Sequence, residues 1–304
     1  MTHRLLTDDE LAELGRSPRE QLADAFDDPD GDTARTVRSL YRGHDASVAG
    51  LETWAATIVD FLSQRGGVRA VTGAVAAMSP VILEDRHGPT GGPDVDTVVA
   101  VAATGDRDAT LAAWDELAAA VRFRHDVLLD VVCVLLSHVY RTDGVDALHD
   151  CLRHTGDHML LSWMPQDVAQ PPEVRVRNWA KMTKGNFATI SVTEDDDRFV
   201  ITQDPCGTCG RQIIDRGYPG PLDLAVVDED DQLLTQGHGG VPVYRTHIPV
   251  LHVELPRERR GTPWPVVRCP SGLKASPCQI VLFKDPDDPR ADRLVGFNDV
   301  PAGG

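Results

Sequence analysis

The spacing of apolar residues changes once along the chain, near residue 187. Before that point, long segments such as residues 51–67 and 108–164 repeat apolar residues at the intervals of an amphipathic helix. After it, "FATISVTEDDDRFVITQ" alternates apolar and polar residues around an acidic turn, which is typical of a β-hairpin. Helices followed by strands predict an α+β fold: an N-terminal helical bundle, then a small, mainly antiparallel sheet with long loops.

Several segments refine this prediction. Residues 51–67 end in two glycines and predict one helix, and residues 68–82 predict the next. Residues 86–94 are rich in Gly and Pro and predict a loop. The run Val127–Leu136 is apolar nearly all round, which predicts a helix buried in the middle of the bundle. Residues 165–173 interrupt the helical pattern, and "PEVRVRNWAKMTKGN" predicts the last helix.

Two stretches of the helical half resemble each other. "FLSQRGGVRAVTGAV" (61–75) and "HVYRTDGVDALHDCL" (138–152) align with a shift of 77 residues, and each places a Gly-Val turn between two helices. A duplicated helical hairpin would produce this pattern. Any two antiparallel helices joined by a glycine turn would produce it as well, so the sequence leaves both interpretations open.

The second half contains three more β-rich runs, "LDLAVVDEDDQLL", "YRTHIPVLHVEL" and "CQIVLFKD", which predict short strands. The change of periodicity predicts a helical region over residues 1–165 and an α+β region over residues 166–304 that carries the chemistry. The two regions can equally form one integrated domain.

Composition restricts the partners. The net charge is −17 and the isoelectric point is near 4.9, whereas nucleic-acid binding relies on clustered Lys and Arg. No apolar run approaches the roughly 20 residues of a spanning helix, and the start of the chain lacks the pattern of a signal peptide. We therefore expect a cytoplasmic protein that binds a small molecule and neither nucleic acid nor a membrane. The sequence leaves the oligomeric state open.

The cysteines indicate where chemistry occurs. Six cysteines are too few for a disulfide scaffold, yet four of them follow residue 200. "CGTC" has a spacing that lets two thiolates face one ion, and "HIPVLH" and "CPSGLKASPC" add imidazoles and thiols. These residues predict a site for zinc or another divalent transition metal. The candidate ligands are Cys206, Cys209, His247, His252 and Cys278.

Other interpretations apply to individual residues. Cys269 is either a further donor or an incidental loop cysteine, and Cys133 and Cys151 fit small buried hydrophobes. The pair His154 and His158 has metal-chelating spacing, but an ordinary solvent-facing helix explains it as well. A dithiol redox role for "CGTC" would require a helix directly after the motif, and "GRQIIDRGYPGP" does not look like a helix start.

Three segments carry a family resemblance: "RFVITQDPCGTCGR", "YRTHIPVLH" and "SPCQIVLFKDPDD". They resemble bacterial proteins similar to L-2-amino-thiazoline-4-carboxylic acid hydrolase, over roughly residues 125–290. The last strand also looks like that of vinyl-4-reductase-type small-molecule-binding domains. The resemblance points to Cys206, His247 and Cys278. The sequence departs from the family pattern in having Cys209 in place of Gly and Ile248 in place of Cys. Leu251 stands at the family's second polar position, and His252 follows one residue later.

The resemblance implies hydrolytic opening of a cyclic C=N bond beside sulfur. A metal held by three protein ligands, with one open position, would polarise the substrate or activate a bound water. Cys209 or His252 would then be a fourth ligand or a proton shuttle. Asp204 or Glu254 would act as general base, and Arg211 would bind a substrate carboxylate.

Together these observations predict a metal-dependent, zinc-type hydrolase or lyase acting on a small amino-acid-like compound with a C–N or C–S bond. The alternative is a small-molecule-binding or sensing protein whose Cys/His zinc site is structural. An open coordination position would favour the enzyme, and four protein ligands would favour the binding protein.

Overall fold

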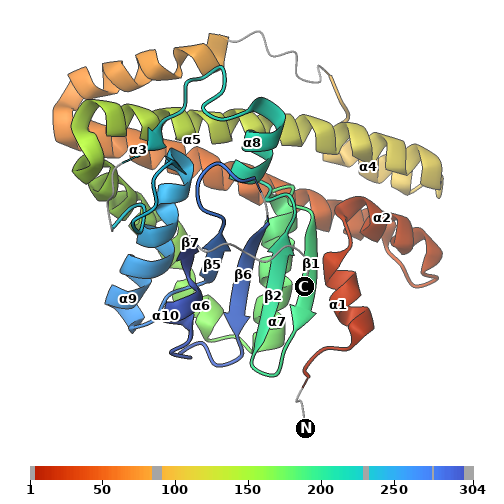
Figure 1. Cartoon of the computed structure of the whole chain (residues 1–304). Coiled ribbons are helices and arrows are strands. Elements are labelled where there is room, and N and C mark those ends of the chain that lie inside the picture. Colours follow the sequence, from red (N-terminus) through yellow and green to blue (C-terminus); the bar gives the residue numbers. More distant parts are fainter. Residues whose placement is uncertain (1–3, 84–90, 229–232, 276, 298–304) are drawn as a thin grey trace.

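The structure is a computed structural model that describes residues 4–83, 91–228, 233–275 and 277–297. It has a long helical region followed by a small mixed sheet, so the predicted α+β class is confirmed. Figure 1 shows helices α3 and α5 running side by side along one edge of the molecule, with the sheet beneath them. Most of the predicted loop at 86–94 lies outside the described residues.

Two glycines interrupt the long helices at matching places. Helix α3 spans Thr33–Leu83 and leaves helical geometry at Gly67, whose φ is 59°. Helix α5 spans Arg107–His158 and does the same at Gly144, whose φ is 85°. Positive φ is accessible to glycine without the steric cost that a Cβ brings. The two glycines are 77 residues apart (144 − 67), which is the shift that relates the two similar sequence stretches.

Short helices surround this pair. The first two begin with reciprocal capping boxes, in which Thr7 pairs with Glu10 and Ser17 pairs with Glu20. None of the helices within the described ranges is long and apolar enough to cross a membrane. The bounds are α1 Asp8–Gly15, α2 Pro18–Asp27, α4 Val95–Ala102, α6 Met164–Val168, α7 Pro172–Gly185, α8 Cys209–Arg216, α9 Leu255–Arg260 and α10 Ala291–Leu294. Helix α6 lies within the segment that was expected only to interrupt the helical pattern, and α7 confirms the last predicted helix.

The main sheet has five strands in the order β1-β2-β6-β5-β7, antiparallel except for the parallel pair β5 and β7. The predicted hairpin is β1–β2, and "CQIVLF" forms β6 at the centre. The bounds are β1 Ile190–Glu194, β2 Arg198–Gln203, β5 Val266–Cys269, β6 Cys278–Phe283 and β7 Gly296–Phe297, with a separate pair β3 Val226–Val227 and β4 Val241–Pro242.

The strand predicted over "YRTHIPVLHVEL" is wrong. The segment forms a 3-10 helix over Val243–Thr246, a π-helix over Ile248–Glu254 and then α9. Nearly all of it is buried, so its side chains show no solvent-facing side from which strand and helix could be told apart. π-helical turns are rare and occur often at functional sites.

One apolar core joins the two halves of the chain. It includes Leu51 and Leu135 from the long helices together with Phe199 and Ile280 from the sheet. Most side chains of the run Val127–Leu136 are fully buried, as predicted. The sheet and the helices therefore hold each other in place through shared contacts.

A buried carboxylate fixes one side of this core. Asp167 of α6 accepts hydrogen bonds from the indole Nε1 of Trp179 at 3.1 Å and of Trp264 at 2.6 Å. The buried Arg175 lies 3.3 Å away and neutralises the charge. Because an unpaired buried charge is costly, the three partners hold Asp167 and thereby orient Trp179.

Candidate functional site

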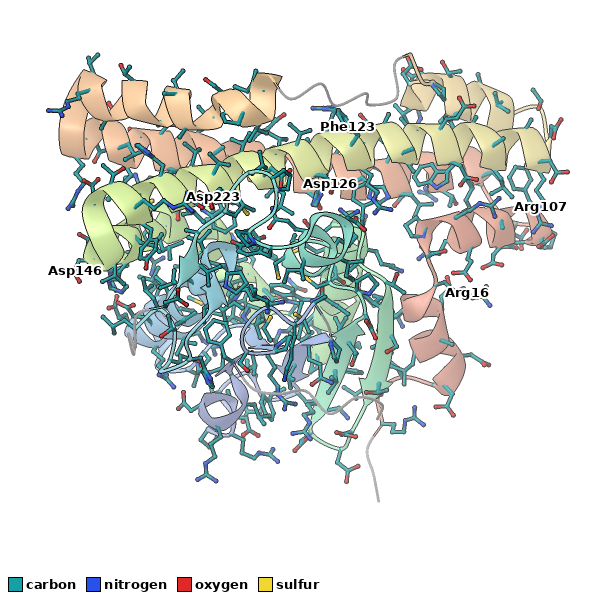
Figure 2. The ribbon with its side chains drawn as sticks, turned by 45° about the horizontal axis from the view of Figure 1, so that its top comes forward. Arg16, Arg107, Phe123, Asp126, Asp146 and Asp223 are labelled. Atoms are coloured by element: carbon teal, nitrogen blue, oxygen red, sulfur yellow. The ribbon has the colours of Figure 1, made fainter. Side chains whose placement is uncertain are left out.

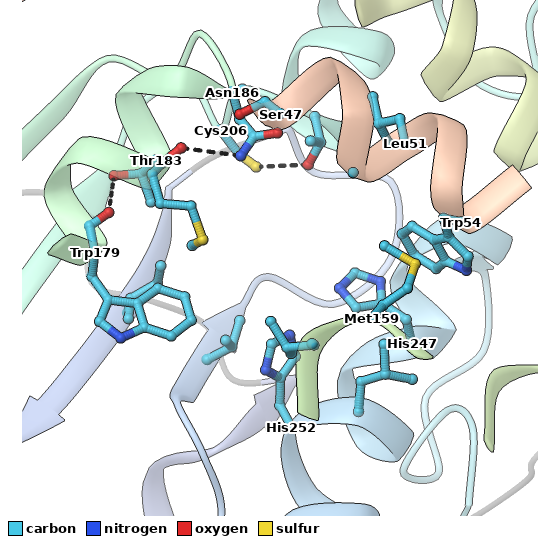
Figure 3. A pocket seen from close by; sticks show the side chains of 18 of the residues that line it. Ser47, Leu51, Trp54, Met159, Trp179, Thr183, Asn186, Cys206, His247 and His252 are labelled. Carbon is cyan, nitrogen blue, oxygen red and sulfur yellow. Dashed lines mark hydrogen bonds between the residues drawn. The ribbon is translucent and has the colours of Figure 1, made fainter. Parts of the chain in front are cut away.

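A pocket of about 940 Å³ lies between α3, α7, the π-helix and one face of the sheet. Figure 3 shows Trp54, Met159 and Trp179 on its wall, with the rings of His247 and His252 facing the cavity. The lining residues of β5 and β6 alternate along each strand, as side chains on one face of a sheet do. They are Val267 and Cys269 on β5, and Cys278 and Ile280 on β6. A concave, largely apolar pocket of this size is typical of a small-molecule site.

Four thiols border this pocket, and all are buried. Cys206 follows β2 and Cys209 begins α8, while Cys269 ends β5 and Cys278 begins β6. The sequence prediction that Cys206, Cys209 and Cys278 converge is consistent with this arrangement, and Cys269 joins them. Strand ends and a helix start, which are rigid parts of the fold, position all four sulfurs.

The two glycines of the "CGTCG" turn are required by close packing. A Cβ on Gly207 would lie 1.9 Å from the carbonyl oxygen of Asn186. A Cβ on Gly210 would lie 2.6 Å from the carbonyl oxygen of Ala275 and 2.9 Å from the Cβ of Cys206. These distances are well below van der Waals contact, so glycine lets the turn press against the loop that precedes β6.

Hydrogen bonds distinguish Cys206 from its neighbours. The side chains of Cys209 and Cys278 form hydrogen bonds with that of Cys206, and the hydroxyl of Thr208 lies 3.4 Å from its sulfur. These hydrogen bonds hold the pKa of the Cys206 thiol well below its usual range, although burial acts in the opposite direction. The same contacts raise the pKa of Cys209 and of Cys278. The arrangement favours one thiolate, on Cys206, flanked by two protonated thiols.

A fully buried arginine supports a negative charge in this cluster. Arg245 donates from Nε to the sulfur of Cys209 at 3.2 Å. Its other nitrogens donate to the carbonyl oxygens of Pro270, Gly272 and Lys274 at 2.5–3.1 Å. Within the described part of the chain no carboxylate pairs with it. A thiolate among these sulfurs would give this buried cation a counter-charge.

Both histidines are neutral at physiological pH. Burial lowers the pKa of His247 to about 4 and that of His252 to about 3, the latter also through the neighbouring imidazole. The Nδ1–H of His247 donates to the carbonyl oxygen of Tyr244, which leaves Nε2 as the unprotonated nitrogen. The Nδ1 of His252 is buried and has no hydrogen-bond partner in the described structure. His247 therefore offers a lone pair near the pocket.

The predicted metal ligands line one pocket, but they do not assemble into one coordination shell. In the described residues, no group of three or more His, Cys, Asp or Glu side chains is arranged to hold a metal ion. The sulfur donors suit zinc chemically, whereas the observed geometry does not bring the mixed Cys/His set around one point. The structure shows these thiols and imidazoles as separate groups that line the same pocket.

The expectation that no helix follows "CGTC" is wrong. Helix α8 begins at Cys209 and carries "GRQIIDR". The motif thus lies between a strand and the first residue of a helix, which is the setting that activates cysteine pairs in redox proteins. The reason given against dithiol chemistry no longer holds.

The three residues predicted to be catalytic lie away from the pocket. Asp204 is exposed, and its neighbour Gln203 lines the pocket instead. Glu254 accepts a hydrogen bond from His149 at 2.6 Å and pairs with Arg153. Neither carboxylate is among the residues that line the pocket.

Arg211 has a structural partner as well. Its guanidinium pairs with Asp126 on α5, which Figure 2 labels above α8, and its Nε donates to the carbonyl oxygen of Gly207 at 3.0 Å. Of the predicted histidine pair, His154 pairs with Asp60 at 3.1 Å, whereas His158 lines the pocket. Arg211 therefore joins α8 to α5 and is not among the residues that line the pocket.

Sequence reasoning missed Arg245, the residue that joins Cys209 to the loop before β6. Its signal was available, because it is the charged residue in an otherwise apolar run. Whether Cys269 belongs to the site also stayed open, because its position depends on strand β5, which the sequence did not predict.

Comparison with protein-family models, curated proteins and solved structures finds no match to this chain.

Proposed function

We propose that the protein is an enzyme that hydrolyses a C–N bond, or a C–S bond, of a small molecule bound in the pocket, with Cys206 as the nucleophile. The observation that supports this is the convergence of Cys206, two thiol donors and a neutral imidazole on one apolar pocket. Nucleophilic catalysis by cysteine requires a thiolate and a nearby proton donor, and this cluster contains both. The choice of bond comes from the family resemblance of the cysteine-bearing segments.

The chemistry can be written with the protein's own groups. The sulfur of Cys206 adds to the electrophilic carbon of a C=N bond, the π electrons move to nitrogen, and nitrogen takes a proton from Cys209 or Cys278. The amine departs as its nitrogen takes a second proton, from water, and the hydroxide that remains adds to the carbon. Carbonyl formation then breaks the bond to Cys206 and restores the thiolate, while the hydroxyl proton passes through the Nε2 of His247 back to the thiol that first gave its proton. Overall, one water is consumed and C=N becomes C=O plus an amine.

The pocket walls indicate what else the substrate carries. Apolar side chains of Leu51, Trp54, Met159 and Trp179 line it. Its volume of about 940 Å³ is in the range of pockets for drug-sized ligands. A compact amino-acid-like compound would fill only part of that space. We therefore infer a substrate whose C–N or C–S group is attached to a larger apolar or aromatic body.

Turnover of defined substrates tests this proposal. Purified protein is assayed for amine release from thiazolines and cyclic amidines, with and without an aromatic substituent, beside Cys206→Ala and the matched control Cys151→Ala. Cys151 is a fully buried thiol of α5 outside the pocket. Activity that is lost in Cys206→Ala and kept in Cys151→Ala is expected. Equal activity in all three proteins would refute the nucleophile.

The metal-dependent form of this hydrolase stays a prediction. Metal analysis of the purified wild type beside Cys206→Ala and Cys278→Ala tests it. Stoichiometric zinc that is lost in both variants would support it, and activity that persists after complete chelation would contradict it.

The second candidate is a protein that binds a small molecule without converting it. The size and the apolar lining of the pocket favour it, because they provide affinity without chemistry. Calorimetric binding of an aromatic thiazoline that is recovered unchanged, with Cys206→Ala binding equally well, would support this candidate over the enzyme.

A further inference from the structure

Cys269 and Cys278 are direct neighbours on adjacent antiparallel strands. The register of β5 and β6 pairs Arg268 with Gln279, so the next two residues, Cys269 and Cys278, face each other across the sheet. Their sulfurs are 3.0 Å apart, and both cysteines are free. Both side chains face the pocket.

We propose that Cys269 and Cys278 are a site of reversible disulfide formation. The proposal stands on the sheet geometry and does not depend on the proposed function of Cys206.

The strands already provide the geometry that a disulfide needs. Residues directly opposite in an antiparallel pair have Cα atoms about 4.5–5.5 Å apart, and disulfides bridge Cα atoms about 4.4–6.8 Å apart. The sulfurs need to approach by only about 1 Å to reach the bond length of about 2.05 Å. Because β6 lies between β2 and β5, the backbone of Cys278 stays fixed during this change.

The reaction balances with a small oxidant that enters through the pocket. With hydrogen peroxide, the two thiols lose two hydrogens, the O–O bond breaks, and two waters form with the S–S bond. With a small disulfide such as oxidised glutathione, the two thiols yield the internal S–S bond and two free thiols. A dithiol reductant reverses either product.

The experiment uses the full chain in reduced form, treated with excess oxidised glutathione or with stoichiometric hydrogen peroxide. Intact mass and peptide mapping under non-reducing conditions are measured before and after treatment, and again after addition of dithiothreitol. The variants are Cys269→Ala and the matched control Cys151→Ala. Mass and mapping need no substrate, so they report on the disulfide even if the protein has no hydrolase activity.

The expected result is a loss of two hydrogens and a bond between positions 269 and 278 in the wild type and in Cys151→Ala. Dithiothreitol restores the two hydrogens, and Cys269→Ala forms no internal disulfide under the same treatment. Two results would overturn the proposal: no internal disulfide in the wild type under excess oxidant, or a wild-type disulfide that contains Cys206 in place of the bond between positions 269 and 278.

Discussion

Replacing Arg245 by methionine tests how the thiol cluster is held. The substitution keeps a long side chain and removes the guanidinium, which is fully buried and makes four hydrogen bonds. Three of its acceptors are carbonyl oxygens of residues 270, 272 and 274, in the loop that connects Cys269 to Cys278. The fourth is the sulfur of Cys209.

The size of the effect follows from these contacts. A buried carbonyl left without a donor costs about 1–3 kcal/mol, and breaking a buried charged contact by removing one partner costs about 3–5 kcal/mol. These costs overlap, because the loop can shift after the first bond is lost. We therefore expect Arg245→Met to lower the free energy of unfolding by about 3–5 kcal/mol, a large part of the typical 5–15 kcal/mol.

Urea unfolding followed by circular dichroism measures this value, with Arg38→Met as the matched control. Arg38 makes an exposed ion pair with Asp96 at 2.8 Å, so its loss should cost less than about 1 kcal/mol. The Arg245→Lys variant, which keeps the charge without the planar fork, should fall between the two. A loss below about 1 kcal/mol for Arg245→Met, equal to the control, would refute the account of the cluster.

Three further predictions concern the turn, the core and pH. Gly210→Ala places a Cβ 2.6 Å from the carbonyl oxygen of Ala275, so urea unfolding should show a loss of about 1–3 kcal/mol; an unchanged midpoint would contradict the packing argument. Asp167→Ala leaves Arg175 buried without its carboxylate and should lower the free energy of unfolding by about 3–5 kcal/mol in the same assay. A decrease below about 1 kcal/mol would contradict this role of Asp167. Burial lowers the pKa of His44, so on acidification the unfolded chain binds this proton before the folded protein does. The free energy of unfolding should therefore decrease as the pH falls below about 6.5, and it should decrease less steeply in His44→Gln. An identical pH dependence in both proteins would contradict this.

The parts of the fold that the sequence predicted are those whose local pattern agrees with their surroundings. The hairpin β1–β2 has one buried and one exposed side along most of its length, so its alternation is visible in the sequence. Cys206 and Cys278 each follow a proline at the edge of a strand, which singles them out in the sequence as candidate site residues. The pairing of Gln203 with Cys278, which brings the two cysteines to the same end of neighbouring strands, depends on the contact between β2 and β6 and is not visible in the sequence.

The missed parts depend on contacts between distant segments. Helix α8 has glycine in its first turn and no side-chain cap, so its sequence signal is weak. It is held instead by tertiary bonds, such as that from Gln212 to Asp130 at 2.6 Å. Asp204 was placed at the site because it is near Cys206 in sequence, yet Gln203, the last residue of β2, lines the pocket, and successive side chains along a strand point to opposite faces.

Site-resolved alkylation of the reduced protein tests the central claim, that Cys206 is the activated thiol of the pocket. The protein is exposed to iodoacetamide from pH 5 to pH 9, and the rate at each of the six cysteines is followed by peptide mass spectrometry. We predict that Cys206 reacts first and keeps its rate at pH values where an ordinary thiol, with a pKa near 8.5, has become slow. If Cys206 reacts no faster than Cys209 and Cys278, and loses its rate at the same pH as an ordinary thiol, the pocket does not contain the proposed nucleophile.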